Sequence, residues 1–214
     1  MNIHTFYARI SPQFRRRRLQ KFSTMLRPQS SERLLDVGGY PWCWPPETRR
    51  AQITLINVAF PPEAKTATTG AFDLVVGDGC ALPFADGAFD IVFSNSAIEH
   101  LGTWERQQRF AAETRRVGRR LWVQTPAREF FLEPHLFAPF VHWLPRSWQR
   151  RLLRYGTLWG WFIRPDRTQI DAFLTEVRLL TFGEMQRLFP DCTILRERFL
   201  GLTKSYIAVR LALP

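Results

Sequence analysis

The sequence predicts an open, doubly wound α/β sheet. Short apolar runs at 33–39, 53–58, 72–78, 89–94 and 120–125 end in small or polar residues. Continuous apolar runs of this length are typical of strands buried on both faces of a parallel sheet. Repeated strand–crossover–strand units of this kind imply helices on both faces.

Two helices are expected around this sheet. Residues 4–27 form an N-terminal arm and helix with Pro12 in the first turn, and this helix covers the sheet or the mouth of the binding site. Its apolar face is expected to carry Phe14, Leu19, Phe22 and Leu26. Residues 96–117 form the clearest helix, which ends at Gly118. Its face is expected to carry Ala97, Leu101, Trp104, Gln108 and Ala111.

We expect one domain over 1–214, with 1–30 as a helical arm and 127–180 as a helical insertion. The insertion is rich in aromatics, prolines and arginines. We expect it to cap the substrate pocket, while contact with a membrane interface or stacking on RNA bases stay open as alternatives. A helix over 181–189 and two strands, 193–200 and 204–211, complete the chain.

Composition limits the environment and the partners. The net charge is +11 and the pI about 10.7, which favours anionic partners, although arginines spread along the chain also serve solubility alone. Three separated cysteines argue against a disulfide framework and indicate a reducing cytoplasm. The sequence shows no signal peptide, no transmembrane segment and no ligand spacing that demands a metal.

The most specific motif is Gly77-Asp-Gly-Cys-Ala-Leu-Pro-Phe-Ala-Asp-Gly-Ala-Phe-Asp-Ile-Val, followed by Glu99-His100. It resembles class I S-adenosylmethionine-dependent methyltransferases, in particular the subgroup known as methyltransferase type 11. The resemblance implies a Rossmann-like, mostly parallel sheet with an antiparallel last strand. It also implies S-adenosyl-L-methionine as the methyl donor.

The same resemblance assigns the donor site to the ends of four strands. Asp36, Gly38 and Gly39 match the family's first glycine motif, but Tyr40 replaces its last glycine. Asn57 stands where an acid usually binds the ribose hydroxyls. Asp78 is expected to accept a hydrogen bond from the adenine amine, or else to cap the turn that follows. The remaining expected donor contacts are Gly79, Cys80, Ser94 and Asn95.

Residues after the fifth strand are the candidates for catalysis. His135 and Glu133 follow the strand end that borders the substrate pocket, and a histidine suits removal of a proton from an oxygen or nitrogen nucleophile. This Glu-Pro-His segment would alternatively only turn the chain into the insertion. We expect Glu99, His100, Phe130 and Phe131 to contact the substrate.

The sequence thus predicts a methyltransferase for a small molecule, with O-methylation in secondary metabolism or in glycan or lipid modification favoured. The substrate is expected to be anionic or lipid-linked. An RNA or protein methyltransferase that docks through the basic surface is the second hypothesis. The third is a binding or scaffold protein whose altered glycine loop no longer accepts the donor.

Overall fold

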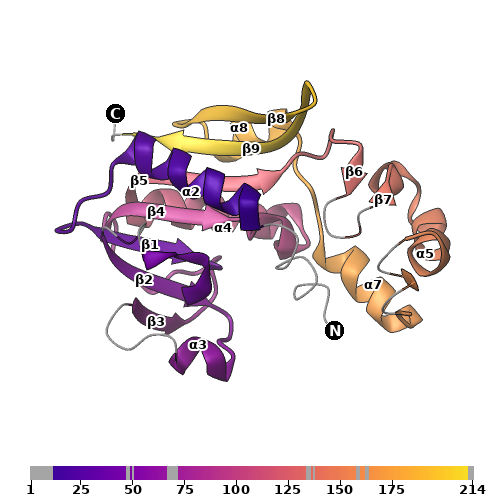
Figure 1. The fold of residues 1–214 in the computed structure, drawn as a ribbon, viewed down its shortest axis with the longest axis horizontal. Coiled ribbons are helices and arrows are strands. Elements are labelled where there is room, and N and C mark those ends of the chain that lie inside the picture. Colours follow the sequence, from indigo (N-terminus) through magenta and orange to yellow (C-terminus); the bar gives the residue numbers. More distant parts are fainter. Residues whose placement is uncertain are drawn as a thin grey trace.

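The computed structural model describes residues 12–46, 49, 51–66, 72–133, 136, 138–157, 160–161 and 164–211. In this part of the chain, a seven-stranded sheet has the order β3-β2-β1-β4-β5-β9-β8 (Figure 1). The first five of these strands run parallel to one another, and β9 runs antiparallel to both β5 and β8. The predicted fold class is confirmed, including the antiparallel last strand. The strands are β1 (Arg33–Val37), β2 (Gln52–Asn57), β3 (Phe72–Val76), β4 (Phe89–Asn95), β5 (Gly118–Pro126), β8 (Thr193–Phe199) and β9 (Leu202–Arg210).

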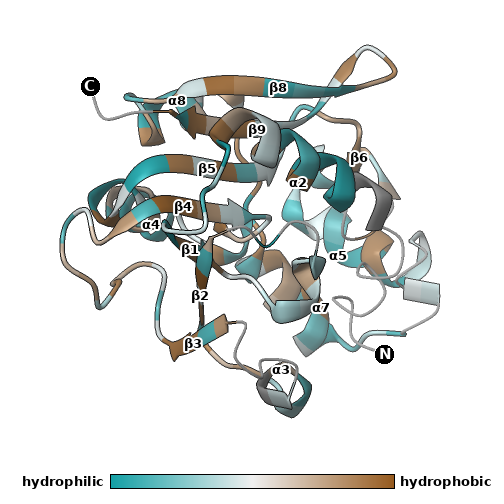
Figure 2. Ribbon diagram, turned by 60° about the vertical axis from the view of Figure 1, so that its left-hand side comes forward, coloured by the Kyte–Doolittle hydropathy of each residue, from teal (hydrophilic) through white to brown (hydrophobic). Residues whose placement is uncertain are grey.

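Helices cover both faces of the sheet, because successive strand residues point to opposite sides and both sides are apolar. On one face, helix α2 (Pro12–Leu26) buries Leu19, Phe22 and Leu26 against the sheet, as its apolar pattern predicts. On the other face, α4 (Trp104–Val117) and α8 (Phe182–Leu188) pack over β4, β5 and β9. The short helix α3 (Pro62–Thr66) follows β2. Figure 2 shows hydrophobic stretches along the strands and a largely hydrophilic α2.

The expected helix over 96–117 is wrong in one respect, because the structure divides it. A short 3₁₀ helix, η3 (Ile98–Leu101), is followed by Gly102 at φ +74° and then by α4. A Cβ at Gly102 would lie 2.7 Å from the carbonyl oxygen of Thr175, so the chain turns here where only glycine fits. Gln108, which the expected apolar face included, is exposed, and its neighbour Gln107 is buried instead.

The insertion after β5 has a small core of its own. It contains the two-stranded ribbon β6 (Leu132–Glu133) and β7 (Ala138–Pro139), the 3₁₀ helix η4 (Val141–Trp143), and helices α5 (Arg146–Tyr155) and α7 (Arg167–Glu176). The insertion lies beyond the ends of β4 and β5, on the right of Figure 1. Its core residues are Leu136, Ala138, Val141, Leu153, Ile170 and Leu174. None of the helices in the described ranges is long and apolar enough to cross a membrane.

Candidate functional site

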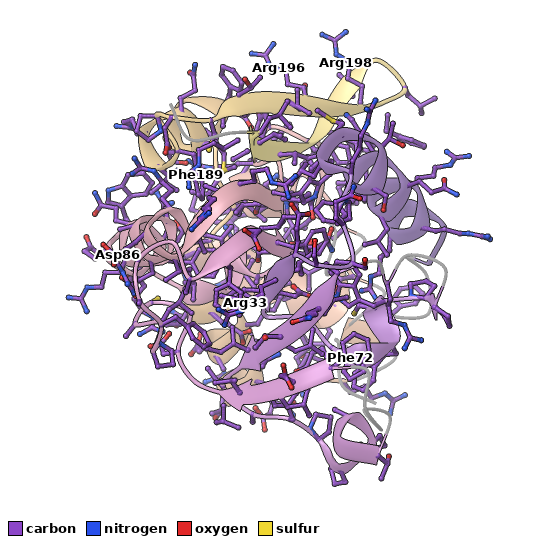
Figure 3. All side chains as sticks on the ribbon, turned by 90° about the vertical axis from the view of Figure 1, so that its left-hand side faces the viewer. Arg33, Phe72, Asp86, Phe189, Arg196 and Arg198 are labelled. Carbon is purple, nitrogen blue, oxygen red and sulfur yellow. The ribbon has the colours of Figure 1, made fainter. Side chains whose placement is uncertain are left out.

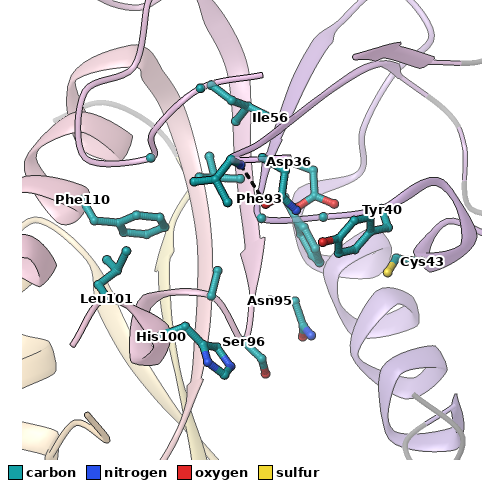
Figure 4. Close-up of a pocket in the computed structure, with 18 of the residues that line it drawn as sticks. Asp36, Tyr40, Cys43, Ile56, Phe93, Asn95, Ser96, His100, Leu101 and Phe110 are labelled. Carbon is teal, nitrogen blue, oxygen red and sulfur yellow. Dashed lines mark hydrogen bonds between the residues drawn. The ribbon is translucent and has the colours of Figure 1, made fainter. Parts of the chain in front are cut away.

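A cleft of about 960 Å³ lies at the carboxyl ends of β1, β2 and β4, where open parallel sheets bind ligands. Figure 4 shows Asp36, Tyr40 and Cys43 on one side of this cleft and Leu101 and Phe110 on the other. The cleft therefore joins the glycine loop after β1 to the start of the segment that leads into α4. Its lining includes these predicted residues: Asp36, Gly38, Gly39, Tyr40, Asn57, Asp78, Gly79, Asn95 and His100.

Asp36, near the end of β1, is a buried carboxylate with one free oxygen. The Trp44 indole Nε1–H donates to its Oδ2 at 2.7 Å, while Oδ1 has no hydrogen-bond partner among the described residues. Burial raises the pKa of Asp36 to about 7, against the opposing effects of the Trp44 hydrogen bond and the nearby Arg15. A buried, unpaired acceptor at a cleft wall is suited to a cationic or hydrogen-bond-donating ligand.

The conformation of the loop after Asp36 explains why Tyr40 can replace the last glycine of the family motif. Gly38 has φ +85°, and a Cβ at Gly39 would lie 1.8 Å from Oδ2 of Asp36, so both positions require glycine. Tyr40 has φ −134°, which any residue adopts, and its ring stacks on Trp42 with centroids 4.7 Å apart. The tyrosine therefore leaves the two conformationally demanding positions unchanged.

Asp78 lines the cleft but is already hydrogen-bonded. The Cys80 backbone N–H donates to its Oδ1 at 2.9 Å, and Arg106 forms an ion pair with Oδ2 at 3.1 Å. The Cys80 hydrogen bond first, and the Arg106 guanidinium with it, lower the pKa of Asp78. Asp78 thus caps the turn after β3 and stays ionised, with lone pairs left for a ligand. Asn57 accepts from the backbone N–H of Val58 at 2.9 Å.

The side of the cleft nearest α2 is a polar network around Arg18. Its guanidinium donates to Glu197 at 3.0 Å, to Gln124 at 3.1 Å and to Asn95 at 3.3 Å. Ser96 has φ +58° and is held there by its backbone N–H bond to the Gln124 carbonyl. This network fixes the end of β4 where the cleft opens.

A histidine and a carboxylate from two different elements meet at the cleft wall. His100 of η3 has Nδ1 3.1 Å from Oε1 of Glu176, the last residue of α7, and both residues line the cleft. An ionised carboxylate only accepts hydrogen bonds, so it holds the proton on Nδ1 and leaves Nε2 as an acceptor. The insertion thereby contributes a charged group to the cleft.

Other predicted residues lie away from the cleft lining. Ser94 is buried and donates to the Val37 carbonyl at 2.9 Å, and Cys80 is buried with its pKa raised to about 11 by burial. Glu99 is fully buried and accepts from Thr125 Oγ at 3.0 Å, so it holds η3 to β5. Phe130 belongs to the sheet core, and the Phe131 ring packs against the Phe130 ring with centroids 4.8 Å apart.

The two predicted catalytic residues are not brought into this cleft by the described part of the chain. Glu133 is buried, accepts from the Leu136 backbone N–H at 2.7 Å, and lines a second cavity inside the insertion. His135 lies outside the described residues, so its role stays a prediction.

Sequence reasoning missed several residues of the cleft. Arg15, Arg18, Trp42, Cys43, Ser96, Arg106 and Glu176 line it as well. The periodicity of α2 places Arg18 next to the buried Leu19, and this is the signal that could have indicated an inward-facing arginine. Nothing in the spacing of His100 and Glu176, 76 residues apart, indicates that they meet.

Comparison with known proteins agrees with this architecture. Residues 37–120 match the family model described as a methyltransferase domain. No curated protein sequence gives a significant match. The fold is similar to that of an S-adenosylmethionine-dependent methyltransferase from Methanosarcina mazei, at 15% identity and TM-score 0.50, over 88% of this chain and 94% of that one. The structure of a second such methyltransferase, from Aquifex aeolicus, has 12% sequence identity and TM-score 0.53, over 89% of this chain and 87% of that one.

A third similar structure is the Burkholderia thailandensis 1,6-didemethyltoxoflavin-N1-methyltransferase, at 13% identity and TM-score 0.57, over 91% of this chain and 76% of that one. That structure holds bound 1,6-didemethyltoxoflavin and S-adenosylhomocysteine. Residues 37–120 thus match a methyltransferase domain, and the sheet has the strand order of the Rossmann-like methyltransferase fold, which implies S-adenosylmethionine as the methyl donor.

The residues of the cleft fit this donor. Asp36 leaves a buried acceptor oxygen unpaired, and Gly38 and Gly39 keep the loop free of side chains beside it. A Cβ at Gly79 would lie 3.0 Å from Phe110 and Val37, so that turn also needs glycine. Asp36, Asn57 and Asp78 would hold the donor at three strand ends, and the donor supplies an electrophilic methyl group when bound.

Proposed function

We propose that this methyltransferase acts on an oxygen of a small molecule and that His100 takes the proton from it. The observation that supports this most is the His100–Glu176 pair at the cleft wall, 3.1 Å apart. An oxygen nucleophile must lose a proton during methyl transfer, and a neutral imidazole held by a carboxylate is suited to accept it. Glu176 would orient the ring and stabilise the imidazolium that forms.

Arginine side chains on two sides of the cleft, which Asp36, Asp78 and Glu176 also line, support an anionic acceptor from secondary metabolism or from glycan or lipid modification. Arg15 and Arg18 line the side near α2, and Arg106 lines the side near α4. Alignment of the acceptor with the methyl group is the larger part of catalysis, because a well-oriented pair reacts without further loss of freedom. The three free thiols in the chain suit a cytoplasmic location for this reaction.

The test is release of S-adenosylhomocysteine with a panel of phenols, carboxylic acids and sugars. With an accepted substrate, His100→Ala should lower kcat about 10²–10⁴-fold. Glu176→Gln should lower it less and shift the pH–rate profile, with donor binding retained in both variants. His142→Ala is the matched control, since His142 lines the second cavity and should leave kcat unchanged.

His135 is the competing proton acceptor, and the same assay separates the two histidines. Unchanged kcat in His100→Ala together with a large loss in His135→Ala would move the role to the segment after β6. Methylation of RNA or protein but of no small molecule would refute the substrate class.

A further inference from the structure

The outer surface of the insertion carries exposed aromatic side chains that the donor cleft does not use. Their exposed fractions run from 48% for Trp143 to 70% for Tyr155. Residues 138–161 also hold four arginines and no acidic residue. Exposed aromatic patches on a protein surface are typical of sites that bind a partner or a membrane. The exposed aromatics among the described residues of the insertion are Phe140, Trp143, Trp148, Tyr155 and Trp161.

Helix α5 sorts these residues onto two faces. Trp148 and Tyr155 are seven residues apart, so they point in nearly the same direction on a helix of 3.6 residues per turn. Arg151 and Arg154 lie beside them on the same exposed side. Leu153 on the opposite side is fully buried in the core of the insertion. One face of α5 is therefore held by the protein, and the other combines aromatic rings with guanidinium groups.

Part of the positive charge on this surface is not neutralised by the protein. Arg150 pairs with Asp171 of α7 at 2.6 Å, and Arg146 donates to the Leu174 carbonyl. In contrast, no ion pair to Arg151 or Arg154 is found within the described part of the chain, and Arg154 lies 5.6 Å from the Tyr155 ring. The surface is positive where it is most aromatic.

We propose that this face of α5, with Trp161 hydrogen-bonded to the Tyr155 carbonyl beside it, docks onto an anionic lipid bilayer. Tryptophan and tyrosine favour the interface between headgroups and hydrocarbon, while arginine stems lie along apolar surface with their charges among anionic headgroups. The surface is the exposed side of a helix and not a groove, which suits a flat bilayer better than a single strand of nucleic acid.

The proposal changes the interpretation of the aromatic segment. Rings that only capped the pocket would point toward the acceptor. In the structure, the insertion contacts the cleft through Glu176 of α7, and these rings are exposed. The insertion lies at the end of the sheet where the cleft opens (Figure 1). A bilayer on its outer face would therefore lie at the same end of the molecule as the reaction. Docking does not require that His100 be the proton acceptor, and it is measured without turnover.

The experiment is co-sedimentation of the full chain with vesicles of phosphatidylcholine alone or with 30% phosphatidylglycerol, a composition of about the charge of natural anionic leaflets. Wild type should bind the anionic vesicles at least about tenfold more tightly. Arg151→Gln with Arg154→Gln should weaken binding about 5-fold for each charge removed. Trp148→Ser with Tyr155→Ser should weaken it about tenfold, and brominated lipid should quench part of the tryptophan fluorescence of the wild type.

Matched controls come from the β8–β9 hairpin. Arg198 points away from the body (Figure 3), and Leu200 is 82% exposed, so Arg198→Gln with Leu200→Ser changes the same kinds of group elsewhere. This control should bind vesicles like wild type. Equal loss in the control and the α5 variants would overturn the assignment to α5. Failure of wild type to bind anionic vesicles, or binding only to an RNA oligonucleotide that the α5 variants lose, would overturn the lipid proposal.

Discussion

The buried carboxylate of Asp36 gives the protein a stability that falls as pH rises. Its pKa is about 7 in the folded protein and 3.8 in an exposed side chain. Below pH about 4, Asp36 is protonated in both the folded and the unfolded chain. Between these values the folded protein holds one proton more, so the free energy of unfolding decreases by about 1.4 kcal/mol per pH unit. Above pH 7 the loss is complete, at roughly 4 kcal/mol.

The variant Asp36→Asn isolates this effect from other titrating groups. Asparagine keeps an acceptor for the Trp44 indole and a similar volume, but it cannot ionise. The difference in unfolding free energy between wild type and Asp36→Asn should therefore favour wild type progressively less from pH 4 to pH 7. Urea unfolding at pH 5, 6, 7 and 8 measures it. Parallel profiles for the two proteins would show that Asp36 ionises normally and would refute the reasoning.

Donor binding should respond to the same ionisation in the opposite direction. The ammonium and sulfonium groups of S-adenosylmethionine are cations, and they favour the ionised form of Asp36. The dissociation constant should rise about tenfold for each pH unit below 7 in wild type and stay nearly constant in Asp36→Asn. Calorimetry in two buffers of different ionisation enthalpy should show proton release on binding near pH 6. Proton uptake would contradict the assignment.

Three further substitutions test the rest of the cleft. Asp78→Ala should weaken binding of S-adenosylhomocysteine by about 1–3 kcal/mol, measured by calorimetry, and unchanged affinity would limit Asp78 to capping its turn. Gly39→Ala places a Cβ against the buried Asp36, so it should lower the free energy of unfolding by about 1–3 kcal/mol. Denaturant titration measures this, and an unfolding free energy equal to that of wild type would contradict the prediction. Arg18→Gln removes the cationic partner of Glu197 and should cost about 2–4 kcal/mol of stability in the same titration. A cost near zero would show that the network is dispensable.

The sheet was predictable because buried parallel strands have a strong local signature. The apolar runs that include Leu34–Leu35 and Ile91–Val92 need no knowledge of distant contacts. The break before α4 was not predictable in the same way. Gly102 is compatible with a helix locally, but it takes φ +74°, and the Thr175 carbonyl from the insertion lies 2.7 Å from where its Cβ would be. That contact joins segments far apart in the sequence.

The same distinction between local geometry and long-range contact applies to the candidate site. Residues in the strand-end turns, such as Asp36 and Gly39, are fixed by local chain geometry and were found from the sequence. His100 was found, but its partner Glu176 arrives from a helix whose position depends on how the insertion packs. Arg106 was missed because nothing in the local sequence indicates its ion pair with Asp78, which lies 28 residues earlier in the chain.

The separate core of the insertion has a consequence for how acceptor choice can change. The residues that bury one another around Leu153 and Ile170 do not belong to either core of the sheet. The Arg178 backbone N–H, which donates to the Glu99 carbonyl, ties the insertion to η3. A replacement segment with the same two ends could thus present a different wall to the acceptor without repacking the strands that hold the donor. In such a molecule, retargeting and methyl-donor recognition are separable traits.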